Sequence, residues 1–133
     1  MGKRRRAREI ALKVLYEIEY NVGSYSDIVK RLIAEEHLEM ELKEFLDQLL
    51  SACTENQKRI DKFIEGRSEH WKLSRMPSVD RNLLRLGMTE LIYIKDIPKS
   101  VTINEYLEIA KRYGTEDSSS FINGILDKFE KPV

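Results

Sequence analysis

The stretch that decides the fold is KRRRAREIALKVLYEI, residues 3–18. Its apolar side chains recur every three or four positions, which is the spacing of an amphipathic helix with one buried stripe. That stripe consists of Ala7, Ile10, Ala11, Val14, Leu15 and Ile18. At about 100° per residue, the opposite side carries Arg5, Arg8, Leu12 and Tyr16. We therefore expect one face to anchor the helix in a core while guanidinium groups and a tyrosine ring face solvent.

Charge is distributed unevenly along a chain whose formal net charge is zero. The 133 residues include 23 basic and 23 acidic side chains, yet the first 13 positions hold six basic residues against Glu9 alone. The rest of the chain must carry an equal excess of negative charge. This predicts one basic pole on an acidic body, suited to a polyanion with unpaired bases. A solvated basic tail without a ligand is the simpler alternative.

Composition favours a folded helical domain in a reducing compartment. Hydrophobic residues make up 41% of the chain and charged residues 35%, with three prolines and six glycines. The lone Cys53 cannot form an internal disulfide, and its place on an apolar helical stripe indicates a core residue. No apolar run reaches the roughly 20 residues that span a bilayer, and no secretory signal is present. We therefore expect a cytoplasmic protein that does not enter the membrane.

Periodicity predicts helices throughout the chain and no strand, which makes the fold all-α with six or seven helices. The expected helices cover residues 5–20, 25–36, 39–65, 77–95 and about 102–113, with a last one capped by Thr115. We expect a single domain over residues 1–133, with an N-terminal helical subdomain at about 1–66, a junction at 67–76 and a C-terminal helical subdomain at about 77–133. Trp71 is expected to pack the two subdomains together.

Several residues are expected to begin or end these helices. Ser24 with Asp27, and Thr102 with Glu105, have the spacing of capping boxes. Glycines at positions 66 and 114 are expected to close two helices, and Glu116 and Asp117 to lie in the first turn of the last one. The helix at 77–95 has apolar residues around more than half of its circumference, so it should be the most buried helix. Its Gly87 would let a neighbouring helix approach closely.

No pattern in the sequence predicts catalysis or a bound cofactor. His37 and His70 lie in different turns, without a cysteine or carboxylate at a metal-ligand interval. The glycines are isolated, so there is no phosphate-binding loop, and the serines at 118–120 are explained by a helix start. We therefore predict a binding protein with no metal and no cofactor, and not an enzyme.

Two stretches resemble the NusB family of transcription antitermination proteins. RRRAREIALKVLYEIEYN (residues 4–21) is similar to the N-terminal helix of that family. The segment at 78–129 is similar to its C-terminal half, through DRNLLRLGMTEL, VTINE, AKRYG and the signature SFINGILD at residues 120–127. With the tryptophan junction included, the resemblance covers nearly the whole chain, although residues 22–60 match only in helical pattern.

The resemblance implies a fold, a ligand and partners. NusB proteins are all-helical, with two packed subdomains, and they bind the boxA segment of nascent RNA together with NusE, a protein of the small ribosomal subunit. The complex helps RNA polymerase to read through terminators, notably in ribosomal RNA operons. The family's RNA-binding positions correspond here to Lys3, Arg4, Arg5, Arg6, Arg8, Tyr16, Asp117 and Phe121. Ser120 occupies a position where relatives often have Lys, so the resemblance does not imply a basic RNA contact at Ser120.

The sequence leaves several alternatives open. Phe121 lies at the edge of its helical stripe, which fits a half-buried core ring as well as a stacking ring, and Asp117 could cap its helix instead of contacting a base edge. A helical protein–protein adaptor without RNA selectivity would use the same basic pole. A fragment of an RNA-modifying enzyme is a further alternative, against which the missing cofactor loop argues. The apolar stripes are compatible with a monomer and with a homodimer.

Overall fold

The computed structural model describes residues 3–20, 23–69 and 72–130, and within them the chain is all-α, as predicted. Seven α-helices and one 3-10 turn form there, with no strand. They are α1 (Lys3–Glu19), α2 (Tyr25–Glu36), α3 (Met40–Glu55), α4 (Gln57–Arg67), η1 (Leu73–Arg75), α5 (Ser78–Tyr93), α6 (Lys99–Tyr113) and α7 (Ser118–Leu126). Trp71 and His70 lie outside the described residues.

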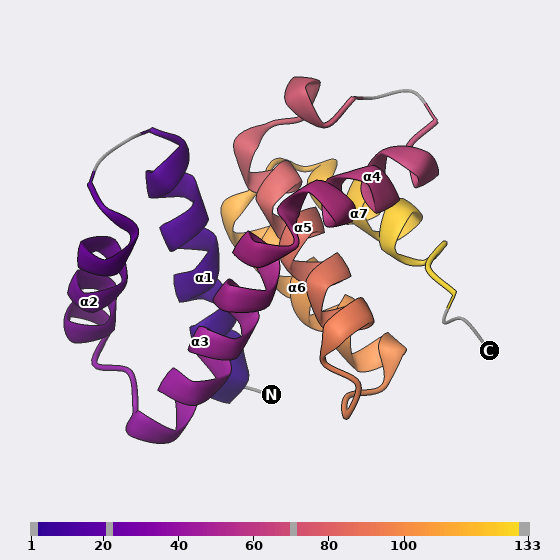
Figure 1. The fold of residues 1–133 in the computed structure, drawn as a ribbon. Helices are drawn as coiled ribbons and strands as arrows, with labels where there is room; N and C mark the ends of the chain where they lie inside the picture. The colour runs from indigo at the N-terminus through magenta and orange to yellow at the C-terminus, as the bar shows by residue number, and fades with distance from the viewer. Residues whose placement is uncertain (1–2, 21–22, 70–71, 131–133) are drawn as a thin grey trace.

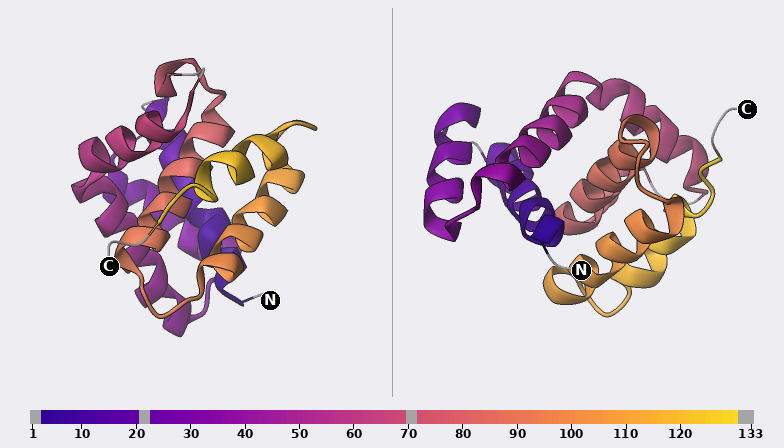
Figure 2. Two further views of the ribbon diagram at one scale, coloured as in Figure 1. Left: turned by 90° about the vertical axis from the view of Figure 1, so that its right-hand side faces the viewer. Right: turned by 90° about the horizontal axis from the view of Figure 1, so that it is seen from below.

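The helices form two groups that meet along α1, α3 and α5. Helices α1, α2 and α3 form one group, while α5, α6 and α7 form the other, as Figure 1 and the view from below in Figure 2 show. Helix α4 packs on α5 more extensively than on α3, which precedes it in the chain. Two packed helical groups are therefore confirmed, while the subdomain limits at residues 66 and 77 stay predictions.

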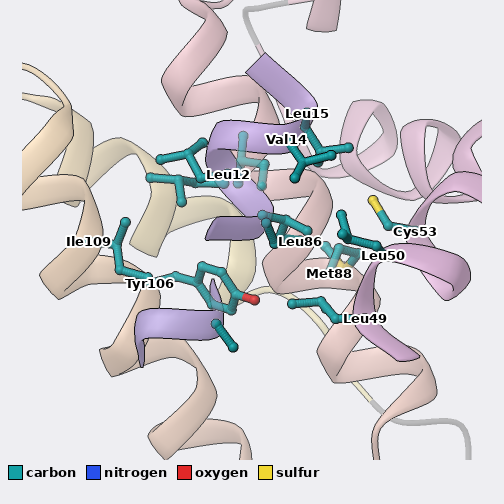
Figure 3. Packing of buried hydrophobic residues seen from close by; sticks show 14 of the residues in the cluster. Leu12, Val14, Leu15, Leu49, Leu50, Cys53, Leu86, Met88, Tyr106 and Ile109 are labelled. Atoms are coloured by element: carbon teal, nitrogen blue, oxygen red, sulfur yellow. The ribbon is translucent and has the colours of Figure 1, made fainter. Parts of the chain in front are cut away.

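Helix α5 lies at the centre, because it packs against α1, α3, α4, α6 and α7. Its Leu83, Leu84, Leu86 and Met88 are fully buried, and Figure 3 shows residues of α1, α3, α5 and α6 meeting in one cluster. At Gly87 a Cβ atom would lie 2.8 Å from Leu126 Cδ1, so any larger residue requires the Leu126 side chain of α7 to move. The sequence-based predictions of a central helix at 77–95 and of a close approach at Gly87 are confirmed.

The single helix expected at 39–65 is wrong, because the chain breaks at Asn56 into α3 and α4. Asn56 leaves the helical region (φ −116°, ψ 20°), and its side-chain amide donates to the Ala52 carbonyl oxygen at 2.8 Å. This bond caps α3 and lets α4 turn onto α5. Gly66 lies inside α4, which ends at Arg67, so its predicted role as a C-cap is also wrong.

Two of the predicted helix starts are wrong, because their polar residues make other contacts. Helix α6 begins at Lys99 after Pro98, and Thr102 is buried with its hydroxyl 3.5 Å from a Glu90 carboxylate oxygen. Helix α7 begins at Ser118, whose hydroxyl accepts the Thr115 N–H at 2.9 Å. The cap at Ser24 is confirmed, since its hydroxyl accepts the Asp27 N–H, and Gly114 ends α6 as expected.

A buried ion pair joins the two groups of helices. Arg8 of α1 donates two hydrogen bonds to Glu90 of α5, from Nε to Oε1 at 2.6 Å and from Nη2 to Oε2 at 3.0 Å. Arg8 is 3% exposed and Glu90 is fully buried. Such a pair must be fully hydrogen-bonded, because the interior does not replace the water that each charge loses.

Side chains from α3 and α6 complete the surroundings of this pair. The Tyr106 hydroxyl donates to Glu90 Oε1 at 2.6 Å, and the Arg8 guanidinium lies 5.1 Å from the Phe45 ring centroid. Burial, and then the neighbouring Glu90 carboxylate, raise the pKa of Tyr106 well above its ordinary 10.0, so its hydroxyl keeps the proton that it donates. Four helices therefore contribute to one polar centre.

Substitution of Arg8 and Glu90 should show that the effect of each charge on the free energy of unfolding depends on the other. Arg8→Met leaves the Glu90 carboxylate buried without a counter-charge and should lower the free energy of unfolding by about 3–5 kcal/mol. Arg8→Met/Glu90→Gln removes both charges and keeps an acceptor for Tyr106, so it should be more stable than Arg8→Met alone. Urea unfolding of both variants measures this difference. A double variant that loses at least as much stability as Arg8→Met would contradict the role of the pair.

Candidate functional site

The first turn of α1 carries four basic side chains, here named the basic arm: Lys3, Arg4, Arg5 and Arg6. The helix begins at Lys3, so the arm is helical from its first described residue. Each of its cations lies beside a carboxylate of another segment. The pairs are Lys3–Glu41 at 3.8 Å, Arg4–Asp96 at 4.0 Å, Arg5–Glu105 at 2.9 Å and Arg6–Glu36 at 3.6 Å.

Arg5 is the most firmly held member of the arm. Its guanidinium donates two hydrogen bonds of 2.9 Å to the two carboxylate oxygens of Glu105 on α6. These bonds lower the pKa of Glu105 below its ordinary 4.5, against the opposing effect of partial burial. Glu105 also lies 3.6 Å from Arg8, so it joins the arm to the buried ion pair.

Arg8 does not lie on a displayed face, and the sequence-based prediction is wrong there. Its guanidinium is enclosed between α3, α5 and α6, and Leu12 of the same predicted face is 4% exposed. The helical wheel misplaced the exposed side because α1 packs against α2, α3, α5 and α6, which cover more than one face.

The side of α1 that faces solvent lies roughly 75° further round the helix. Its exposed or half-buried residues, including the one that follows the helix, are Arg6, Glu9, Lys13, Tyr16 and Tyr20. Tyr16 is 43% exposed, and its ring lies 4.8 Å from that of Tyr20, centroid to centroid, at an interplanar angle of 44°. Tyr16 therefore is displayed as the sequence predicted.

A groove of about 360 Å³ opens beside Tyr16, and it is here named the tyrosine groove. Its lining residues are Leu12, Lys13, Tyr16, Glu17, Val79 and Tyr113. Lys13 Nζ lies 5.9 Å from the Tyr113 ring centroid, and the Arg112 guanidinium lies 5.2 Å from it. An apolar floor with two phenol rings and nearby cations can hold a flat aromatic group that carries negative charge close by.

A second groove, of about 310 Å³, lies beside Phe121 and is here named the phenylalanine groove. Its lining residues are Met76, Pro77, Asp80, Thr115, Asp117 and Phe121. Phe121 is half-buried, as its edge position predicted. Asp117 is exposed at the start of α7 and makes no side-chain capping bond, so the capping alternative is wrong.

The two grooves are neighbours on the fold. Val79 lines the first and Asp80 lines the second, at the start of α5, while Tyr113 and Thr115 stand on either side of Gly114. Adjacent residues of α5 thus line the groove of Tyr16 and the groove of Phe121 and Asp117, which lie about 100 residues further along the chain.

Three residues of this surface were missed from the sequence: Lys13, Arg112 and Tyr113. Lys13 was missed because the exposed side of α1 was placed too far round the helix. Tyr113 and Arg112 belong to the motif AKRYG at residues 110–114, which was interpreted as a helix end and as part of the family resemblance, with no site residue assigned to it. Their position beside Gly114 was the available signal.

The part of the chain that the structure describes contains no metal site, reactive cysteine or membrane-spanning helix. No group of three His, Cys, Asp or Glu side chains is placed there to hold a metal ion. Cys53 is fully buried, and burial raises the pKa of its thiol, which makes it a core residue as predicted. Among the described helices, none is both long and apolar enough to cross a membrane.

The lowered pKa of Glu105 predicts how stability depends on pH. Because the folded protein keeps this carboxylate ionised where the unfolded chain protonates it, its contribution is present above the ordinary 4.5 and is lost as pH falls through the lowered value. Glu105→Gln should therefore be less stable than the wild type at pH 7, by a margin that shrinks towards pH 3. Urea unfolding across this range measures the margin, with the exposed Glu116→Gln as control. A margin that does not change with pH would contradict the role of Glu105.

Comparison with known proteins gives consistent matches along the chain. The sequence pattern of the NusB family matches residues 5–131. The transcription antitermination protein NusB of Trichlorobacter lovleyi is 44% identical over 130 residues, which cover 98% of this chain and 92% of that protein. The structure of T. maritima NusB superposes with a TM-score of 0.88 at 41% identity, covering 96% of this chain and 89% of the other.

A further solved structure contains partners. It is described as the antitermination factors NusB and NusE in complex with double-stranded RNA. Its matching chain superposes with a TM-score of 0.85 at 28% identity, covering 96% of this chain and 95% of that one.

Proposed function

This chain belongs to the NusB family of transcription antitermination proteins, and we propose that it binds boxA-type single-stranded RNA together with NusE. In this role it acts in the cytoplasm within the RNA polymerase antitermination complex and promotes read-through, notably in ribosomal RNA operons. We propose it as a binding protein and not as an enzyme. The relatives named above support this proposal, and so does the likeness to a NusB chain solved with NusE and RNA.

The observation that carries the proposal is the layout of α1. Four basic side chains occupy its first turn, and the tyrosine groove opens ten residues beyond Arg6, or about 15 Å along the helix. Cations that neutralise phosphates and aromatic rings that stack on bases are the two elements of single-strand binding. They lie here along one helix, with Lys13 between them.

Each site residue then has a proposed role. Lys3, Arg4, Arg5 and Arg6 neutralise phosphates, and Tyr16 stacks on an unpaired base. Tyr113 and Phe121 extend the stacking surface through their grooves, and Asp117 accepts a hydrogen bond from a base edge. Arg8 acts on RNA only by fixing α1 against α5, because its guanidinium is committed to Glu90.

The rival proposal is a helical adaptor that binds a protein partner without RNA selectivity. The related complex contains double-stranded RNA, so a test of this proposal must also compare single-stranded with double-stranded RNA. A shift assay with a boxA-type strand, a scrambled strand and a duplex of the same sequence separates these cases. We expect the boxA-type single strand to bind most tightly, and equal binding of all three would favour the adaptor.

Removal of the loosely held cations should reduce the salt dependence of RNA binding. Lys3→Gln/Arg4→Gln/Arg6→Gln removes three positive charges, and the slope of log affinity against log salt should become shallower by up to about 2, since each phosphate contact on a single strand contributes at most about 0.7. Titration of a boxA-type strand at several salt concentrations measures the slope. The exposed Lys62→Gln on α4 is the control and should leave it unchanged. An unaltered slope in the triple variant would contradict phosphate binding by the arm.

The contribution of the tyrosine groove to RNA binding should come from contact with a base and not from contact with the RNA backbone. Tyr16→Leu or Tyr113→Leu keeps apolar packing and should weaken binding by about 1–3 kcal/mol, the range for one stacked base. Strands with one abasic position, moved along the sequence, should identify a position at which the substitution has no further effect. Tyr25→Leu, an exposed tyrosine on α2, is the matched control. If abasic substitution at every position leaves the loss undiminished, no base stacks in the groove.

A further inference from the structure

We propose that Glu36, Glu41 and Asp96 suppress the binding of RNA strands that contact only the basic arm, because in the free protein they are paired with the cations that would bind phosphate. The inference rests on the proposed RNA binding and adds residues that limit it to strands with further contacts. These three carboxylates come from the end of α2, the first turn of α3 and the loop between α5 and α6. Segments far apart in the sequence therefore surround one helical turn.

The arm divides into one firmly held cation and three exchangeable ones. Arg5 is bound to a Glu105 side chain that is only 10% exposed, through two hydrogen bonds. The pairs of Lys3, Arg4 and Arg6 have carboxylate distances of 3.6–4.0 Å, which exceed hydrogen-bond length. Glu41 and Asp96 are 69% and 71% exposed, so phosphate can replace them without rearranging the core.

Glu36 is the most embedded of the three and joins the arm to the tyrosine groove. Its carboxylate lies 3.6 Å from Arg6 and 3.1 Å from Lys13 Nζ, seven residues further along α1. Arg6 also donates to the main-chain oxygen of Glu36. One carboxylate therefore neutralises a cation of the arm and the cation that lines the groove beside Tyr113.

Weak binding at the arm follows from the exchange of one anion for another. A phosphate that replaces a carboxylate gains little net electrostatic free energy, because the cation was already neutralised. A strand that contacts only the arm therefore binds weakly, whatever its sequence. A strand that also places bases in the two grooves gains stacking that the carboxylates do not supply, so it binds more tightly although it has the same cost of exchange at the arm.

The same exchange affects counterions. Binding of phosphate to a free cation releases the ions condensed on RNA, and this release steepens the dependence of affinity on salt. A carboxylate that loses its partner becomes exposed and attracts cations from solution, which offsets part of the release. The wild-type slope should therefore be smaller than the number of phosphates contacted would give.

The test compares two variants of the full chain that lose equal charge. Glu36→Gln/Glu41→Gln/Asp96→Asn removes the carboxylates of the arm. The control, Asp47→Asn/Glu55→Gln/Asp127→Asn, removes three exposed carboxylates elsewhere. Affinity is measured for a boxA-type strand and for a scrambled strand of the same composition, across salt, after thermal unfolding has shown that both variants fold.

The first variant should bind the scrambled strand at least about tenfold more tightly than the wild type does, with a steeper slope. Its affinity for the boxA-type strand should rise by a similar factor, because the cost of displacing the carboxylates is the same for every strand that contacts the arm. The control should raise both affinities slightly and alike. The inference is overturned if the two variants bind the scrambled strand equally. The proposed function fails separately, if the wild type does not prefer the boxA-type strand over the scrambled one.

Discussion

The hydrogen-bonded ion pair between Arg8 and Glu90 fixes the arrangement on which the rest of the structure depends. It joins α1 to α5, and Tyr106 brings α6 to the same carboxylate. A desolvated pair of this kind tolerates little displacement, because each charge needs the other at hydrogen-bond distance. The rotation of α1 about its axis is therefore set, and with it the choice of side chains that reach the surface.

The surface chemistry is a consequence of that rotation. With Arg8 and Leu12 turned inward, α1 displays Arg6, Lys13 and Tyr16, and its first turn lies within reach of carboxylates from four segments. The same helix thus supplies a structural cation to the core, exchangeable cations to the solvent and one wall of the tyrosine groove. Residues that pack in the core and residues proposed to bind the ligand are therefore close neighbours along one helix.

Features that rest on local periodicity were predictable from the sequence. The all-α fold, the central helix, the close approach at Gly87 and the cap at Ser24 are of this kind. The burial of Arg8 was not predictable from the sequence. Its partner Glu90 lies 82 residues away, and an arginine among the polar residues of a helix is ordinarily expected to be exposed. Tertiary contacts also explain why Thr102 does not cap α6, since it is buried beside Glu90. The turn at Asn56 was missed because the apolar spacing of the helix continues on both sides of it.

We propose that this surface binds RNA in cooperation with NusE. The chain has one basic pole, so its affinity for RNA should be modest until a partner adds to the binding surface. Titration calorimetry of a boxA-type strand into the chain alone, into NusE alone and into their mixture tests this most directly. We expect the mixture to bind at least ten times more tightly than either protein alone, with one strand for each pair. Affinity in the mixture equal to that of the tighter single protein would contradict the claim.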